Sequence, residues 1–302
     1  MSVPSTTAGH GLDTSLAGLH LASPLLTAAG CGGPELAPFT DLTRLGALVT
    51  RTVTSDPKAG TPSPRLAETP SGLLSAVGEQ NPGLQGFLAT ELPWYAQRGI
   101  RTIVSISADS LAEHGELARR IGAAPGVAAL EVRLGTPDGY QTGKVVHVVS
   151  RDAPRGVPVL AKLPPAGDPA EHARAAMDNG ADAVVVGAGF PGLVVDPHTL
   201  RPLLGAGVGL LSGPAVHPLA LRAVYDVHAA AADVPVVGVG GIRTGFDVLA
   251  MLAAGATAVQ LGSVLYSDPG APDRIVAELA EELERRDLES VADAVGLAHE
   301  RP

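Results

Sequence analysis

The sequence predicts an α/β fold, namely a (β/α)8 TIM barrel with an N-terminal hairpin and a long loop after the second strand. Short apolar segments rich in Val, Ala and Leu alternate with longer amphipathic segments along the chain. The last two apolar segments end in glycine turns, at Gly240-Gly241 and at Gly262-Ser263. One barrel also suits a chain of 302 residues, and the 37 glycines and 26 prolines suit its many short turns. We therefore predict a single domain over residues 1–302.

The individual elements follow from the same apolar pattern. Residues 1–10, rich in Ser, Thr and Gly, are predicted to be loose, and LDTSLAGLHLASPLL predicts a hairpin that closes the bottom of the barrel. Barrel strands are expected at 25–29, 47–53, 102–107, 127–134, 157–163 and 181–189, and the last two end at Gly240 and Gly262. Residues 55–86, rich in Pro, Gly and Ser, predict a long loop over the active face. The charged residues 271–302 predict a C-terminal helical tail.

The composition excludes several classes of protein. With 21 basic and 31 acidic residues, the chain has a net charge of −10 and no basic footprint for nucleic acid. A single cysteine allows neither an internal disulfide nor a cysteine-rich metal site, so no metal is predicted. No apolar run reaches the roughly 18 residues of a membrane span, and the N-terminus lacks a signal pattern. We expect a cytoplasmic protein that acts on a small molecule.

The two glycine turns near the C-terminus predict a phosphate site. In a (β/α)8 barrel the loops after strands 7 and 8 often bind phosphate. Glycine lets backbone N–H groups approach an anion closely, and a following helix N-terminus adds partial positive charge. We therefore expect a phosphate-bearing cofactor at Gly240-Gly241 and Gly262-Ser263.

A series of strings carries a resemblance to a known family. Between Leu16 and Pro269 the chain contains, in order, LGALVTRTVT, TPSPRLAETPSGLLSAVGEQNPGL, ELPWYA, PVLAKLPP, LLSGPAVHPLALR, VPVVGVGGI and ATAVQLGSVLYSDP. These strings resemble the class 1 dihydroorotate dehydrogenases, FMN-dependent (β/α)8 enzymes of pyrimidine synthesis. The resemblance implies that the phosphate-bearing cofactor is FMN.

The resemblance also implies which residues hold the flavin. They are Ala29, Gly30, Arg51, Thr52, Ser105, Lys162, Gly213, Gly240, Gly241, Gly262 and Ser263. Lys162 would lie near the N1 side of the flavin, where a cation stabilises the anionic reduced form. A barrel-interior lysine paired with a carboxylate such as Glu131 is the structural alternative. Arg51 and Thr52 stand where the family usually has Lys-Ser, and Ser105 stands where it has asparagine.

The substrate loop departs from the family pattern. Thr136 stands at the position of the family's catalytic cysteine, and Asp138 is the second candidate for proton transfer or, alternatively, an ordinary turn residue. With Lys162 these two residues form the predicted catalytic set. The predicted substrate-facing positions are Arg51, Ser75, Arg133, Ala188 and Gly189, of which the last four replace family asparagines or an Asn-Thr pair.

These replacements bear on the substrate. Each neutral hydrogen bond contributes about 0.5–1.5 kcal/mol and each charged one about 1.5–3 kcal/mol, so loss of the amides removes most recognition of orotate. We therefore predict a divergent FMN-dependent oxidoreductase of this family that transfers hydride between flavin and another small molecule. One alternative is a true dihydroorotate dehydrogenase that uses a hydroxyl base, and another is a non-catalytic flavin-binding or scaffold barrel.

The expected partners also follow from the resemblance. Relatives form homodimers or pair with an iron–sulfur electron-transfer subunit, so we expect a homodimer and allow for an electron-transfer partner. One cysteine cannot ligate an iron–sulfur cluster within this chain.

Overall fold

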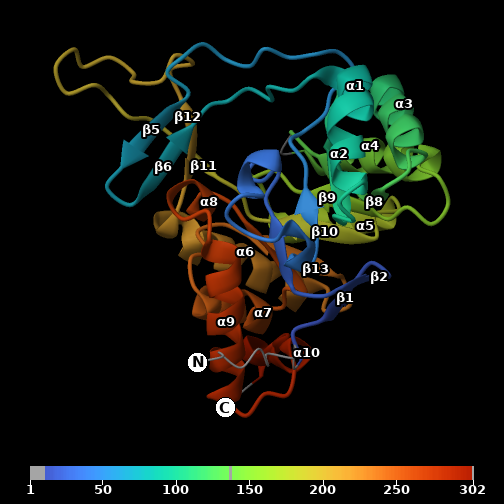
Figure 1. The fold of residues 1–302 in the computed structure, drawn as a ribbon, viewed down its shortest axis with the longest axis vertical. Coiled ribbons are helices and arrows are strands. Elements are labelled where there is room, and N and C mark those ends of the chain that lie inside the picture. The colour runs from blue at the N-terminus through green and yellow to red at the C-terminus, as the bar shows by residue number, and fades with distance from the viewer. Residues whose placement is uncertain (1–10, 136–137, 301–302) are drawn as a thin grey trace.

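The computed structural model describes residues 11–135 and 138–300 and confirms the predicted barrel. Within these residues, eight parallel strands follow the order β3-β14-β13-β10-β9-β8-β7-β4 (Figure 1). The first and last strands meet through a bridge between Leu26 and Ala47, and the Gly46 N–H donates to the Leu25 carbonyl at 2.9 Å. The sheet is therefore closed, and the carboxyl ends of its strands share one mouth.

The strands lie close to their expected positions. The barrel strands are β3 (Leu25–Thr27), β4 (Leu48–Val49), β7 (Thr102–Ile106), β8 (Val127–Arg133), β9 (Val159–Lys162), β10 (Ala183–Val186), β13 (Val236–Val239) and β14 (Ala258–Leu261). The remaining strands are β1 (Thr14–Leu16), β2 (Leu19–Leu21), β5 (Leu66–Thr69), β6 (Gly72–Ser75), β11 (Phe190–Gly192) and β12 (Gly209–Ser212).

Helices cover the outside of the barrel. They are α1 (Gly83–Gly86), α2 (Leu92–Ala96), α3 (Leu111–Gly122), α4 (Gly139–Asp152), α5 (Pro169–Asp178), α6 (His217–Ala230), α7 (Gly245–Ala253), α8 (Val264–Ser267), α9 (Ala271–Glu284) and α10 (Val291–Ala294). Short 3-10 turns are η1 (Pro34–Leu36), η2 (Leu42–Arg44), η4 (Pro214–Val216) and η5 (Leu297–His299), and η3 (Phe87–Glu91) is a π-helical segment. The C-terminal part of the described chain thus contains α9, α10 and η5.

Alternation along each strand divides the barrel into an inside and an outside. One buried cluster fills the interior with aliphatic side chains such as Leu26, Ile103, Leu160 and Val237, and a second cluster lies between strands and helices. Full burial of each Val, Leu or Ile side chain contributes about 1.5–3 kcal/mol. The predicted N-terminal hairpin, β1–β2, also joins the interior cluster, since Leu16 and Leu21 are fully buried there.

A second sheet was not expected from the sequence. The long loop after the second barrel strand contains the β5–β6 hairpin, and β6 pairs with β12, which pairs with β11, from the segment after β10. Figure 1 shows this four-stranded sheet well away from α10. Its own buried cluster is small, with Ala67, Leu74 and Leu204. The sequence pattern missed it because its strands are short and only partly buried, and because β6 pairs with β12 over a long sequence separation.

Candidate flavin site at the barrel mouth

Four polar side chains form a layer directly above the aliphatic barrel interior. They follow interior positions by two residues on each strand: Ser105 after Ile103, Glu131 after Ala129, Lys162 after Leu160 and Gln260 after Ala258. Ser105, Glu131 and Gln260 are completely buried, and the Lys162 side chain is 15% exposed. Polar groups in such a position need partners, because burial without hydrogen bonds costs several kcal/mol.

Lys162, Gln260 and Glu131 provide those partners for one another. The Lys162 Nζ donates to Gln260 Oε1 at 3.0 Å, and the Gln260 Nε2 donates to Glu131 Oε2 at 2.6 Å. Lys162 Nζ also lies 3.9 Å from Glu131 Oε1, which makes no hydrogen bond among the described residues. The Lys162–Glu131 pairing that the sequence offered as an alternative to a flavin role is therefore present, and Gln260 fixes the ammonium group at the mouth. Sequence reasoning missed Gln260, although a glutamine at an inward position of an otherwise apolar strand was a visible signal.

The glycine turns after β13 and β14 and the turn after β12 lie side by side at this mouth. A Cβ on Gly241 would lie 2.7 Å from the Gly213 carbonyl oxygen and 2.8 Å from the His217 nitrogen, and a Cβ on Gly213 would lie 2.7 Å from the Gly72 Cα. Both glycines also have positive φ, 69° and 104°. Only glycine fits these two positions, so the backbones of the turns can lie in direct contact.

Gly30 and Gly262 border space in the same region. A Cβ on Gly262 would meet only Ala28 Cβ and Cys31 Sγ, at 3.8 and 4.0 Å, and one on Gly30 would meet only Arg51 Cα, at 4.0 Å. A Cβ at either position would make only ordinary van der Waals contacts, so the backbone here is open to close approach by another group. This glycine-lined cradle beside a fixed ammonium group fits a phosphate-bearing, ring-containing anion such as FMN.

The helix after β13 contributes less than expected. Asp247 Oδ2 accepts the Arg243 and Thr244 N–H groups at 2.9 and 3.0 Å, and Glu278 Oε2 accepts the Gly245 N–H at 2.8 Å. Thr244 caps the same turn through the Asp247 N–H. These N–H groups already donate to carboxylates of the chain. The glycine turns and Ser263, rather than the N-terminus of α7, are therefore available to bind an anion.

Arg51 and Thr52 lie at the carboxyl end of the second barrel strand, as expected. The Arg51 Nε lies 3.6 Å from Glu91 Oε2, and the Arg51 side chain is 40% exposed. Burial raises the pKa of the Glu91 carboxyl more than Arg51 lowers it. The Thr52 and Ser105 hydroxyls lie 3.1 Å apart. This contact links Ser105 of the polar layer to Thr52, one of the residues around the barrel mouth that we call the rim.

Glu79 joins the rim from the long loop. Its carboxylate pairs with Arg133, at the end of β8, and with Lys58 Nζ at 3.1 Å. Burial raises the pKa of Glu79, but Arg133 and Lys58 outweigh it, so the net pKa is lowered and the carboxylate is ionised at neutral pH. Glu79 therefore links the long loop to the end of β8 through two cationic partners.

Cys31 and Tyr266 also lie beside this cradle. The Tyr266 hydroxyl lies 3.9 Å from Cys31 Sγ and 3.4 Å from the Gly30 carbonyl oxygen. Burial raises the pKa of the Cys31 thiol, and Tyr266 and Lys162 offset this only in part. The thiol is thus held in its protonated form, which suits packing better than nucleophilic chemistry.

The remaining predicted residues are more dispersed. Thr136 lies outside the described residues. Asp138 caps α4, since its Oδ1 accepts the Tyr140 N–H at 2.9 Å. Ser75 ends β6 and pairs with Leu66 and Leu210 in the second sheet. Ala188 and Gly189 lead from β10 into that sheet, where a Cβ on Gly189 would lie 2.9 Å from Leu210 Cβ.

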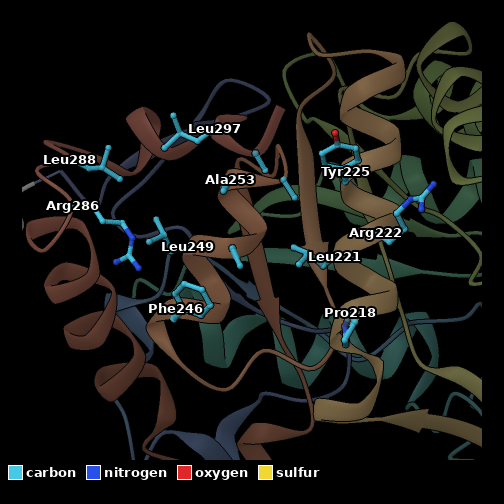
Figure 2. A pocket seen from close by; sticks show the side chains of 13 residues that line it. Pro218, Leu221, Arg222, Tyr225, Phe246, Leu249, Ala253, Arg286, Leu288 and Leu297 are labelled. Atoms are coloured by element: carbon cyan, nitrogen blue, oxygen red, sulfur yellow. The ribbon is translucent and has the colours of Figure 1, made fainter. Parts of the chain in front are cut away.

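An apolar pocket lies elsewhere, on the outer surface of the barrel (Figure 2). It has a volume of about 500 Å³, and Leu221, Tyr225, Phe246, Leu249 and Leu297 line it. These residues come from α6, α7 and η5, outside the ring of strands. The pocket is therefore separate from the polar layer and the glycine turns.

Residues 11–135 and 138–300 contain neither a candidate metal site nor a candidate membrane span. That part of the chain holds no group of three or more His, Cys, Asp or Glu side chains placed to bind a metal. Its helices are all too short or too polar to cross a membrane.

Comparison with known proteins gives the family. The family described as "Dihydroorotate dehydrogenase" matches residues 11–283. The chain is 42% identical over 299 residues to the catalytic subunit of dihydroorotate dehydrogenase B (NAD(+)) of Desulforudis audaxviator, covering 94% of this chain and 96% of the relative. It is 36% identical to the subunit of the same name from Geobacter sp. strain M21, with coverage of 94% and 97%.

A solved structure supports the fold. The chain superimposes on the crystal structure of DHODH from Eimeria tenella in complex with ferulenol with a TM-score of 0.79. The match covers 99% of this chain and 92% of that one, at 21% identity. The family match, the two full-length relatives and the common barrel lead to one conclusion: the chain belongs to the dihydroorotate dehydrogenase family, oxidoreductases that act on CH–CH bonds.

Proposed function

We propose that this protein oxidises dihydroorotate with bound FMN, as the catalytic subunit of a dihydroorotate dehydrogenase. The observation that carries the proposal is identity of 36–42% over 94% of the chain to proteins named as such subunits. This similarity favours dihydroorotate over the different substrate expected from the altered loop. The polar layer and the glycine cradle support the same proposal, because they provide a fixed cation and an anion-binding backbone at one mouth.

Different residues of the mouth would bind the phosphate and the ring of FMN. Gly213, Gly240-Gly241 and Gly262-Ser263 would hold the phosphate through backbone groups. Lys162, fixed by Gln260, would face the ring and stabilise negative charge there. When bound, FMN supplies the acceptor for a hydride from the substrate C–H bond.

Proton transfer requires a group near the end of β8. Thr136 and Asp138 are the proposed candidates. A hydroxyl is a weak proton acceptor at neutral pH unless a base adjoins it. Asp138 already caps α4 through the Tyr140 N–H. We therefore propose, from its place in the sequence, that Thr136 accepts the substrate proton, while Asp138 holds the start of α4.

The relatives' names also bear on partners. A protein named as a catalytic subunit of an NAD(+) enzyme works with a further subunit, so we propose an electron-transfer partner for this chain. A homodimer of the barrel and a cytoplasmic location stay predictions.

Anaerobic reduction of the flavin tests the proposed function. Protein loaded with FMN is mixed with dihydroorotate, and the visible absorbance of oxidised flavin is followed. We expect rapid bleaching with dihydroorotate and none with orotate, which has no hydride to give. Flavin that stays oxidised in the presence of dihydroorotate would overturn the proposal.

A second candidate is oxidation of a different small molecule by the same flavin site. The Arg133–Glu79 ion pair also supports it, because an exposed arginine at the mouth can bind the carboxylate of a molecule other than a dihydropyrimidine. This candidate predicts that dihydroorotate fails to bleach the flavin while another reduced small molecule succeeds. Flavin that no such donor reduces would instead support the non-catalytic barrel.

A further inference from the structure

Arg133 is an exposed cation at the mouth that has capacity for a second partner. It follows Glu131 by two residues on β8, and its backbone is in register with Lys162 on β9. Its side chain is 44% exposed, and Nη1 donates to Glu79 Oε1. A guanidinium has five N–H donors in a planar fork, so a single bond to Glu79 leaves donors for a planar oxyanion.

Glu79 is held firmly enough to aim that guanidinium. Its backbone has a φ of 55°, an uncommon conformation for a residue other than glycine that costs about 1–3 kcal/mol. Asn81 maintains it: its Nδ2 donates to the Glu79 carbonyl and to Thr54 Oγ1, both at 2.8 Å. The Asn81 Oδ1 accepts the Thr54 and Gly83 N–H groups, and Asn81 is 5% exposed. Backbone strain at this residue is therefore stabilised by a buried network.

The charges of the cluster do not cancel. Lys58 and Arg133 share the single carboxylate of Glu79, which leaves one positive charge in excess. Charge-assisted, bidentate bonds between arginine and carboxylate are among the strongest hydrogen bonds in proteins. An incoming carboxylate would thus find both a neutralising charge and a matching geometry.

We propose that Arg133 binds the carboxylate of the substrate and that Glu79 is the positioning residue that aims it. Specificity for a ring with a carboxylate then comes from an ion pair on β8 and the long loop, rather than from side-chain amides. This inference deepens the proposed function and rests on it for the identity of the ring.

Equilibrium binding to the oxidised, FMN-loaded protein tests this role without turnover. Orotate and uracil share a ring and differ in the carboxylate. The dissociation constant of uracil divided by that of orotate therefore isolates the carboxylate contribution. We expect the unchanged protein to bind orotate much more tightly than uracil. Arg133→Gln should reduce that ratio by about 10- to 150-fold, the equivalent of one charge-assisted hydrogen bond.

Two more variants separate positioning from general damage. Glu79→Gln keeps the shape but removes the carboxylate that aims Arg133. Its added positive charge alone would raise the same ratio, so a ratio lowered by a smaller factor than in Arg133→Gln is the result expected of a positioning residue. Arg133→Lys should recover part of the Arg133→Gln loss, because it restores the charge without the fork. Arg119→Gln is the matched control: Arg119 is also an exposed arginine paired with a carboxylate, but it lies on α3. It should leave the ratio unchanged.

The outcomes distinguish this inference from the proposed function. An unchanged uracil-to-orotate ratio of dissociation constants in folded, flavin-retaining Arg133→Gln protein would overturn the role of Arg133. Equal binding of orotate and uracil by the unchanged protein, or no binding of orotate, would overturn it as well. Arg133-dependent orotate binding with no bleaching by dihydroorotate would support the inference and overturn dihydroorotate oxidation.

Discussion

Replacement of Gln260 by leucine tests the polar layer most sharply. The change removes a 2.6 Å bond to the Glu131 carboxylate and a 3.0 Å bond from the Lys162 ammonium. Leucine has a similar volume, so no large cavity forms. The completely buried Glu131 would keep only Lys162, at 3.9 Å. Because each lost bond involves a charged group and a buried carboxylate loses its hydrogen bond, we expect a loss of about 3–5 kcal/mol in the free energy of unfolding.

Urea unfolding followed by circular dichroism measures this loss. The control replaces all three residues together, as Lys162→Met, Glu131→Leu and Gln260→Leu. Apolar residues of similar volume leave no buried charge, so this variant should recover most of the lost stability. A loss below about 1 kcal/mol in Gln260→Leu would refute the reasoning, because such a value is typical of an isolated neutral hydrogen bond.

Three further predictions concern the glycine cradle, the thiol and acid stability. Gly241→Ala and its control Gly99→Ala both place alanine at a positive φ, 69° and 66°, but only Gly241 is crowded by neighbouring atoms. Only Gly241→Ala should therefore lose FMN on purification, and the flavin content per protein measures this loss. Burial raises the pKa of the Cys31 thiol, so iodoacetamide should still label it slowly at a pH of about 8.5, where an ordinary thiol reacts readily; fast labelling at neutral pH would contradict this. Burial lowers the pKa of His114 and His228, so the unfolded chain binds more protons below about pH 6.5 and stability should fall as the pH drops through that value. Urea midpoints across this range should fall less in His114→Gln, and equal slopes in both proteins would count against the assignment.

The barrel could be predicted from the sequence because its strands produce local patterns. Buried parallel strands appear as short apolar runs, and the runs at Val127–Arg133 and Val236–Val239 matched the structure closely. The glycine turns after the last two strands were visible for the same reason. The second sheet was not, because β6 pairs with β12 over a long sequence separation and both strands are only half-buried. No local pattern encodes that pairing.

The candidate site was predictable in part. The resemblance gave Lys162 as a flavin residue, and the need to pair a buried cation gave Glu131 as its partner in the alternative interpretation; the structure shows the pair, while the flavin role stays a prediction. Gln260 was missed although its polar side chain in an apolar strand was a visible signal. The two cations on Glu79 depend on how the long loop packs against the end of β8, which no local pattern encodes. Comparison of single positions pointed to a new substrate, whereas similarity over the whole chain favours dihydroorotate.

An FMN-bound crystal structure would test the account most directly. A flavin phosphate against the turns at Gly213, Gly241 and Gly262-Ser263, with the ring edge beside Lys162, is what the polar layer and the cradle require. Density for the flavin at any other place on the protein, or protein that takes up no FMN at all, would contradict it.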